Sequence, residues 1–228
     1  NNITNISEIS YFSNLETLKC NNHQLTSLDV SMLANLKKLV ANKNQLTSVV
    51  LPNPADPIIS SNLEFLSLEH NFLTSINLSN LSLQKVFLSY NNFTTVNLES
   101  FVGVNSNLNS SNNYGIISIS NNPNLSFINL PSYSNFDSVS DFYVLDIENT
   151  NISLSIFTTS NGVDAIPYPF AKAGRATQLN MLNTPMNEGF NNFQTTYTGT
   201  EQYFPPEFSN INSYYNHATV IFGNAIRT

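Results

Sequence analysis

Charged residues and cysteine are scarce in this sequence, and each shortage excludes a class of protein. Only 10% of the 228 residues are charged, where a globular domain averages about 25%. With 8 Lys+Arg and a net charge of −7, the chain has little means of neutralising a phosphate backbone, which excludes nucleic-acid binding. The single cysteine excludes an intrachain disulfide framework and a cysteine-rich metal site. No apolar run reaches the roughly 18 residues of a membrane-spanning helix.

Asparagine and apolar residues are what the sequence has in quantity. There are 39 asparagines, and hydrophobic residues make up 41% of the chain, including 16 Phe. Neutral amides therefore supply much of the polar surface, while the apolar content predicts a buried core in one large domain or two small ones. The chain opens on Asn1-Asn2-Ile3-Thr4 without Met or a signal sequence. We therefore expect a processed product or a piece of a longer protein.

One register of apolar and polar residues recurs along the first two thirds of the chain. Apolar residues at positions 1, 4 and 6 precede an Asn-like residue at position 9, and one more apolar residue follows at position 11. The four clearest copies are Leu15, Leu18, Cys20, His23, Leu25; Leu36, Leu39, Ala41, Asn44, Leu46; Leu63, Leu66, Leu68, Asn71, Leu73; and Leu83, Val86, Leu88, Asn91, Phe93. Each copy continues into a second apolar pair: Leu28/Val30, Val49/Leu51, Ile76/Leu78 and Val96/Leu98.

This register, L-x-x-L-x-L-x-x-N-x-L, resembles that of leucine-rich repeat (LRR) proteins. The string Leu25-Thr26-Ser27-Leu28-Asp29-Val30 and its partial copy at 45–49 resemble in particular the repeats of secreted or surface LRR proteins of Bacteroidetes-type bacteria. In that family a Cys often fills the position held here by Cys20. The resemblance covers about residues 3–157, and it implies an LRR solenoid in an extracellular or cell-surface protein.

Less regular copies extend the pattern at both ends. Two of them follow the four clear ones: Tyr114, Ile117, Ile119, Asn122, with one residue inserted afterwards, and Phe142, Leu145, Ile147, Thr150, Ile152. A weaker copy is Ala176, Leu179, Met181, Thr184, and Ile6, Ile9 and Tyr11 resemble the second half of a repeat. We therefore expect a solenoid at 1–157 that starts inside a repeat. Residues 158–228, rich in Gly, Pro and aromatic residues, are expected to form a cap or docking segment that holds up to two degenerate repeats.

The pattern predicts a β-rich solenoid with parallel strands stacked on one face and few or no helices. In each repeat the L-x-L core is a short strand whose two apolar residues point inward. One repeat cannot bury its apolar edge alone, so neighbouring repeats stack and their strands pair. The string Ala218-Thr219-Val220-Ile221-Phe222 predicts a further strand near the end of the chain because of its high β-propensity.

The Asn-like residue lies where the chain leaves the strand and turns, and we call it the turn position. An inward amide both donates and accepts hydrogen bonds, so it satisfies backbone groups that have left the strand ladder. We expect a structural role at this position for His23, Asn44, Asn71, Asn91, Asn122 and Thr150.

No catalytic or metal-binding pattern is found, and we expect neither enzymatic activity nor a cofactor. The histidines His23, His70 and His217 have no acidic or Cys partner at ligand spacing. Asp146 and Glu148 would lie on the same side of one strand. The two carboxylates of a glycosidase instead have to face each other across a gap. Cys20 occupies an inward apolar position, which predicts a buried and inert thiol.

The outward residues of the strands form a candidate binding face. Apolar residues that the repeat does not need inside are candidates for contact with a partner. The predicted face consists of Lys38, Val40, Phe65, Ser67, Lys85, Phe87 and Tyr90. Lys38 and Lys85 lie on one side of the face and Glu69, Asp146 and Glu148 on the other, which predicts a charge gradient.

Two functions remain open at this stage. The first is a non-catalytic recognition or adhesion module that binds a protein or a glycan through the strand face, although the absence of Trp weakens sugar stacking. The second is a structural subunit that assembles with other copies of itself, head to tail, through exposed solenoid ends into a filament or surface layer.

Overall fold

In the computed structural model, the chain folds into a stack of short parallel strands. The structure describes residues 2–52, 62–101, 115–129, 143–152, 176–180, 184 and 219–221. The strands are β1 (Thr17–Lys19), β2 (Ser27–Asp29), β3 (Lys38–Val40), β4 (Ser48–Val50), β5 (Phe65–Ser67), β6 (Lys85–Phe87), β7 (Thr95–Asn97), β8 (Gly115–Ser118), β9 (Phe127–Asn129), β10 (Tyr143–Asp146), β11 (Ala176–Asn180) and β12 (Thr219–Ile221). Within these ranges the one helical element is the 3-10 helix η1 (Ser7–Tyr11).

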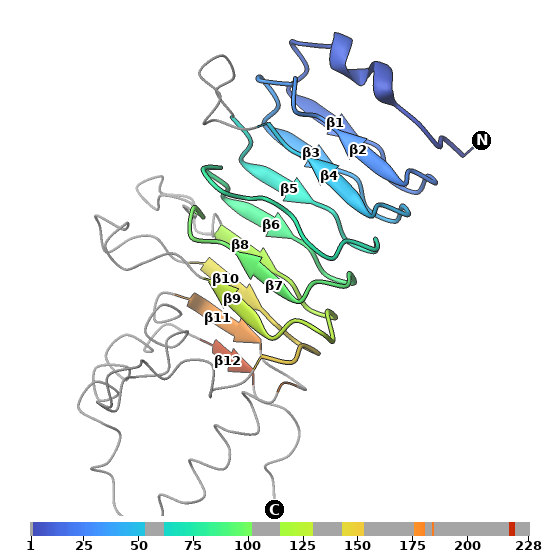
Figure 1. The fold of residues 1–228 in the computed structure, drawn as a ribbon. Helices are drawn as coiled ribbons and strands as arrows, with labels where there is room; N and C mark the ends of the chain where they lie inside the picture. The colour runs from blue at the N-terminus through green and yellow to red at the C-terminus, as the bar shows by residue number, and fades with distance from the viewer. Residues whose placement is uncertain are drawn as a thin grey trace, which may run out of the picture.

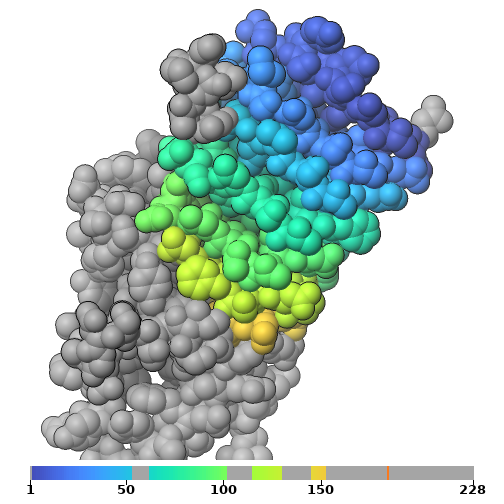
Figure 2. All heavy atoms as spheres, viewed as in Figure 1, coloured from blue at the N-terminus to red at the C-terminus, as the bar shows by residue number. Residues whose placement is uncertain are grey.

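Eight of the strands form one parallel sheet, which we call the large sheet. Its order is β1-β3-β5-β6-β8-β10-β11-β12, so each coil of the chain adds one strand next to the previous one (Figure 1). The central apolar residues pair in register, with Leu18 opposite Leu39, Leu39 opposite Leu66 and Leu66 opposite Val86. In the space-filling view the sequence colours follow one another as bands down the stack (Figure 2). The prediction of stacked parallel strands in a solenoid-like, strand-rich fold is confirmed.

The other strands line the opposite wall in two small parallel sheets, β2-β4 and β7-β9. Leu28 pairs with Val49, and Val96 pairs with Ile128. A single apolar core lies between the two walls, and both walls contribute residues that the repeat pattern places inside. The fully buried side chains include Leu25, Leu36, Leu39, Leu46, Leu63, Leu66, Leu68, Leu73 and Phe93.

The two halves of each coil differ in how constant their length is. From the first strand to the second wall, Leu18 lies 10 residues before Leu28, and the same count separates Val86 from Val96. The return to the next strand varies: 10 residues separate Ile76 from Val86, whereas 21 separate Val96 from Ile117. The half that contains the turn position varies by one residue only, since 11 residues separate Ile117 from Ile128, and the return half takes up the long insertions.

The repeat geometry extends beyond the four clear copies at both ends. At the beginning, the Gln24 N–H donates to the Ile3 carbonyl at 3.0 Å, as the Gln45 N–H donates to the Leu25 carbonyl at 2.9 Å one coil later. At the other end, Leu179 of β11 pairs with Leu145 of β10, and β12 pairs with β11. The large sheet thus includes strands from the segment 158–228, most of which lies outside the described residues.

Candidate binding face

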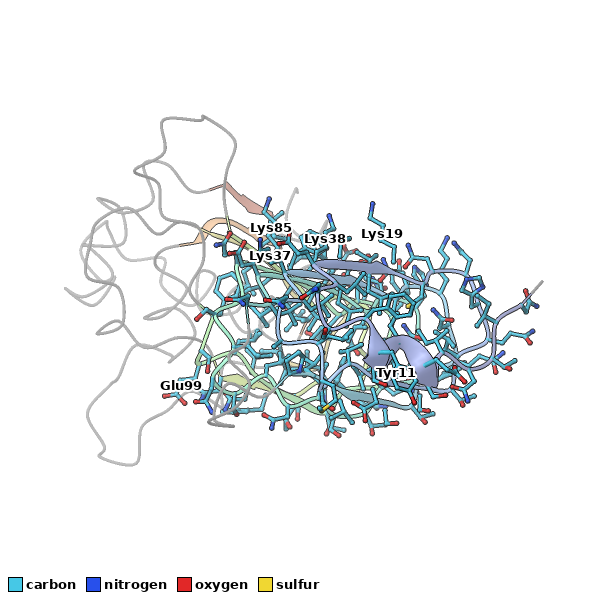
Figure 3. The ribbon with its side chains drawn as sticks, turned by 90° about the horizontal axis from the view of Figure 1, so that it is seen from above. Tyr11, Lys19, Lys37, Lys38, Lys85 and Glu99 are labelled. Atoms are coloured by element: carbon cyan, nitrogen blue, oxygen red, sulfur yellow. The ribbon has the colours of Figure 1, made fainter. Side chains whose placement is uncertain are left out.

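The strand face is the outer surface of the large sheet, formed by the outward side chains of β1, β3, β5, β6, β8 and β10. Figure 3 shows Lys19, Lys38 and Lys85 projecting from one side of the stack, whereas Glu99 lies on the opposite side. Because the strands pair in register, Lys38, Phe65 and Lys85 form one row across β3, β5 and β6.

The centre of this face is a cluster of two phenylalanines and a lysine. The ring centroids of Phe65 and Phe87 lie 5.4 Å apart with an interplanar angle of 36°, a tilted contact that is favourable between aromatic rings. The Lys38 Nζ lies 4.0 Å from the centroid of the Phe65 ring, within the range of a cation–π interaction. All three side chains remain partly exposed. The cluster therefore combines apolar area with positive charge at the surface.

Two more rings stack beside the strand face, at the turns that follow β5 and β6. His70 and Tyr90 lie with their ring centroids 4.1 Å apart and their planes within 10° of each other. Both backbones are in the left-handed region, with φ of 55° and 59°, although a non-glycine residue there costs about 1–2 kcal/mol. Tyr90 is 49% exposed, so this pair widens the aromatic surface beyond the strands.

The left-handed conformation recurs at the residue before every turn position. The residues are Asn22, Lys43, His70, Tyr90, Asn121 and Asn149, with φ between 53° and 60°. In this conformation each N–H from Asn22 to Asn121 reaches a carbonyl of the next coil; for example, the Tyr90 N–H donates to the Ser120 carbonyl at 3.0 Å. The left-handed backbone at these positions was not predicted from the sequence. Asn at three of the six positions was the available signal, since Asn tolerates the left-handed region.

Ser67, which we expected on the exposed face, is buried instead. It is 4% exposed, and its Oγ donates to Asn42 Oδ1 at 2.9 Å. The same Asn42 oxygen accepts the Glu69 N–H at 2.9 Å, and the Asn42 amide donates to the Glu69 carboxylate at 3.2 Å. Ser67 is thus a small, satisfied position between larger outward residues, and it contributes little surface to a partner.

Serine hydroxyls form a directed chain at the far end of the strand face. Ser118 Oγ donates to Asp146 Oδ2 at 3.2 Å. Ser118 and Ser89 are joined at 2.9 Å, and Ser120 donates to Ser89 at 3.1 Å. Because a hydroxyl has one proton and that of Ser118 goes to the carboxylate, Ser89 donates to Ser118. Ser89 and Ser120 are buried. This chain of hydrogen bonds links the coils of β6, β8 and β10.

The turn positions form a ladder of buried amides, which we call the asparagine ladder. The Asn91 Oδ1 accepts the N–H of Leu73 in the previous coil at 3.0 Å, and its Nδ2 donates to the carbonyls of Leu68 at 2.9 Å and Leu88 at 3.1 Å. Each amide thus links its own turn to the coil before it. The same three kinds of bond recur at Asn44, Asn71 and Asn122.

The residues at the ends of the ladder make fewer bonds. At one end, the buried Nδ1 atom of His23 has no hydrogen-bond partner among the described residues. At the other end, Thr150 Oγ1 donates to the Ile147 carbonyl at 2.8 Å and is 4% exposed. Thr184, the corresponding residue after β11, is also buried.

The described residues also bear on two other possibilities, a reactive side chain and a membrane-spanning helix. Burial raises the pKa of the Cys20 thiol to about 11, which keeps it protonated and weakly nucleophilic at neutral pH. Within the described ranges no three His, Cys, Asp or Glu residues gather as metal ligands would. In those same ranges no helix has the length and apolar character to cross a bilayer. The expectations of no enzymatic activity and no cofactor stay predictions.

Comparison with known proteins adds no relative. No protein-family model, no curated protein and no solved structure matches the chain significantly. The function is therefore inferred from the strand face itself.

Proposed function

We propose that this chain is a leucine-rich repeat protein of the extracellular space or cell surface, and that it acts as a non-catalytic recognition or adhesion module. Its strand face binds a protein or a glycan. The repeat register and the in-register stacking of its L-x-L strands support the assignment to the LRR class. The low charge of the chain and its neutral polar surface suit an extracellular location.

The cluster of Phe65, Phe87 and Lys38 is the observation that carries the proposal. The core of the solenoid is complete without these side chains, because Leu66 and Val86 of the same strands are the residues that point inward. Aromatic and basic residues contribute strongly to binding when a partner covers them. Their position on the outer surface of the large sheet, across the neighbouring strands β3, β5 and β6, is suited to contact with a large ligand.

A paired set of variants tests this function. Binding of the wild-type chain to an array of glycans and extracellular proteins is compared with that of Phe65→Ser/Phe87→Ser. The matched control is Val50→Ser/Phe127→Ser, because these exposed residues lie on the opposite wall. We expect the face variant to lose the ligands that the wild type and the control variant bind. Equal binding by all three proteins would show that the strand face is not the recognition surface.

A specific observation at the end of the stack also favours the second function, head-to-tail assembly. β1 is the terminal strand of the large sheet, and the turn position beside it is where His23 Nδ1 has no partner among the described residues. An edge strand presents unpaired backbone groups to another chain. Sedimentation velocity over a wide concentration range tests this role. Assemblies that grow in size with protein concentration are expected, and a monomer at every concentration would eliminate the role.

A further inference from the structure

Two strands of the strand face, β3 and β6, each present a lysine and an apolar residue. β3 presents Lys38 and Val40, and β6 presents Lys85 and Phe87. β5 lies between them and is in register with both. Since neighbouring strands lie about 4.8 Å apart, the two Lys–apolar pairs repeat at about 9.6 Å.

Between these pairs, the surface is shaped by the outward residues of β5. In the lysine row, Phe65 separates Lys38 from Lys85 and holds the Lys38 ammonium over its ring at 4.0 Å. In the apolar row, the buried Ser67 separates Val40 from Phe87. The charged groups of the lysine row therefore lie on β3 and β6, which are two strands apart. The larger side chains of the apolar row lie on the same two strands.

The lysines of this surface are available to an anion. Lys19, Lys38 and Lys85 make no ion pair with any described residue, whereas Lys37 is paired with Glu16 at 2.9 Å. Lys38 and Lys85 are the first residues of β3 and β6, so in a chain with a net charge of −7 they give that edge of the strand face a local positive charge. Glu69 lies beyond the other end of β5, where its carboxylate accepts the Asn42 amide at 3.2 Å. Charge complementarity thus selects an anionic ligand that lies over the lysine edge of β3, β5 and β6.

The spacing selects the conformation of that ligand. A polyproline II helix has three residues per turn and a rise of about 3.1 Å, so residues i and i+3 lie on one edge about 9.3 Å apart. In an extended β-strand, residues on one side repeat at about 6.7 Å, which matches neither one nor two strand spacings. Aromatic surfaces are also the surfaces that bind proline-rich peptides in this conformation.

We propose that the strand face binds an acidic, proline-rich peptide segment in the polyproline II conformation. Carboxylates at positions i and i+3 pair with Lys38 and Lys85, and the adjacent proline edge packs on Val40 and Phe87. This inference rests on the proposed recognition function and names the class of partner for the same surface.

Two peptides of one composition test the spacing. The first probe has four Glu-Pro-Pro triplets, and the second, its block isomer, has the same residues arranged as two Glu-Glu-Pro-Pro-Pro-Pro blocks, in which no two Glu are three residues apart. Both carry a fluorescent label, and binding is measured by fluorescence anisotropy at low and physiological salt. The protein variants are Lys38→Glu/Lys85→Glu and the matched control Lys37→Glu, with circular dichroism as the check on folding. Polygalacturonate, an anionic polysaccharide, serves as a competitor.

The triplet peptide is expected to bind at least about tenfold more tightly than its block isomer, which corresponds to two matched surface ion pairs together with the apolar contacts. The Lys38→Glu/Lys85→Glu variant is expected to lose this preference, and the Lys37→Glu variant to keep it. Equal affinity for the two isomers, or binding that survives in the double variant, would overturn the inference.

Failure of this inference can be told apart from failure of the recognition function. If polygalacturonate binds in a manner that depends on Lys38 and Lys85 while neither peptide does, the peptide class is wrong and the recognition surface stands. If the ligands found on the arrays are bound equally by the wild type and by Phe65→Ser/Phe87→Ser, the recognition function itself is wrong.

Discussion

Replacement of Asn91 by alanine tests the role of the asparagine ladder most directly. The change removes the acceptor of the Leu73 N–H, and Leu73 is fully buried. The carbonyls of Leu68 and Leu88 each keep a partner, because Asn71 donates to Leu68 at 3.0 Å and Asn122 donates to Leu88 at 3.1 Å. A buried polar group left without a partner costs about 1–3 kcal/mol. For this one N–H we expect a loss of about 2 kcal/mol in the free energy of unfolding.

Asn92→Ala is the matched control, since it removes the same side chain from the adjacent, exposed position. Urea unfolding followed by circular dichroism measures both variants. The Asn91 variant is expected to lower the midpoint by about 1 M urea, and the control to stay within about 0.5 kcal/mol of the wild type. Equal midpoints for the two variants would refute the structural role of the amide.

Asn91→Asp separates hydrogen bonding from side-chain size. The new side chain has the shape of Asn and still accepts the Leu73 N–H, but an ionised carboxylate has no proton for the carbonyls of Leu68 and Leu88. Burial beside two carbonyl oxygens favours the neutral acid and raises its pKa above the value in the unfolded chain. The deficit in stability therefore grows as the pH rises above the unfolded pKa. Comparison with the wild type at pH 5 and pH 7 is expected to show the larger difference at pH 7.

Other buried groups predict three further outcomes. Thr150→Val removes the 2.8 Å bond to the Ile147 carbonyl and should cost about 1 kcal/mol in urea unfolding; a loss as large as that of Asn91→Ala would contradict this. Leu66→Ala, at a residue with 0% exposure, should lower the unfolding free energy by about 3–5 kcal/mol, and a change below 1 kcal/mol would refute its place in the core. The Cys20 pKa is raised from 9.0 to about 11, so the thiol should react with a disulfide reagent only as fast as the protein opens. Because burial disfavours the thiolate in the folded protein, the stability should fall as the pH rises from about 9 toward 11; Cys20→Ala should remove that pH dependence, and rapid labelling of the folded protein below pH 9 would contradict the burial of the thiol.

The strands and the core of this protein are predictable because both follow from one repeated pattern. Leu18, Leu39, Leu66 and Val86 occupy equivalent positions in the sequence and become in-register neighbours in the large sheet. The burial of Asn at the turn positions also follows from the sequence, since each amide has the same environment in every coil.

Features that depend on side-chain contacts between coils were not predictable in the same way. His70 and Tyr90 stack with both backbones in the left-handed region; His is enriched in that region, but Tyr gives no signal for it. The burial of Ser67 depends on Asn42, which lies 25 residues away in the chain. A single strand pattern places Ser67 outward, and only the neighbouring coil shows that its surface is covered.

The unequal halves of each coil have a consequence for how such a molecule can change over time. Extra residues on the return half leave the turn positions aligned, so the asparagine ladder and the strand register survive an insertion there. One extra residue before a turn position would move the amide away from its bonds. Accordingly, the longest intervals, from Val96 to Ile117, from Val49 to Leu66 and from Ile128 to Leu145, all fall on the return half. New sequence, whether acquired by natural variation or grafted by an engineer, is best tolerated along that one flank of the stack.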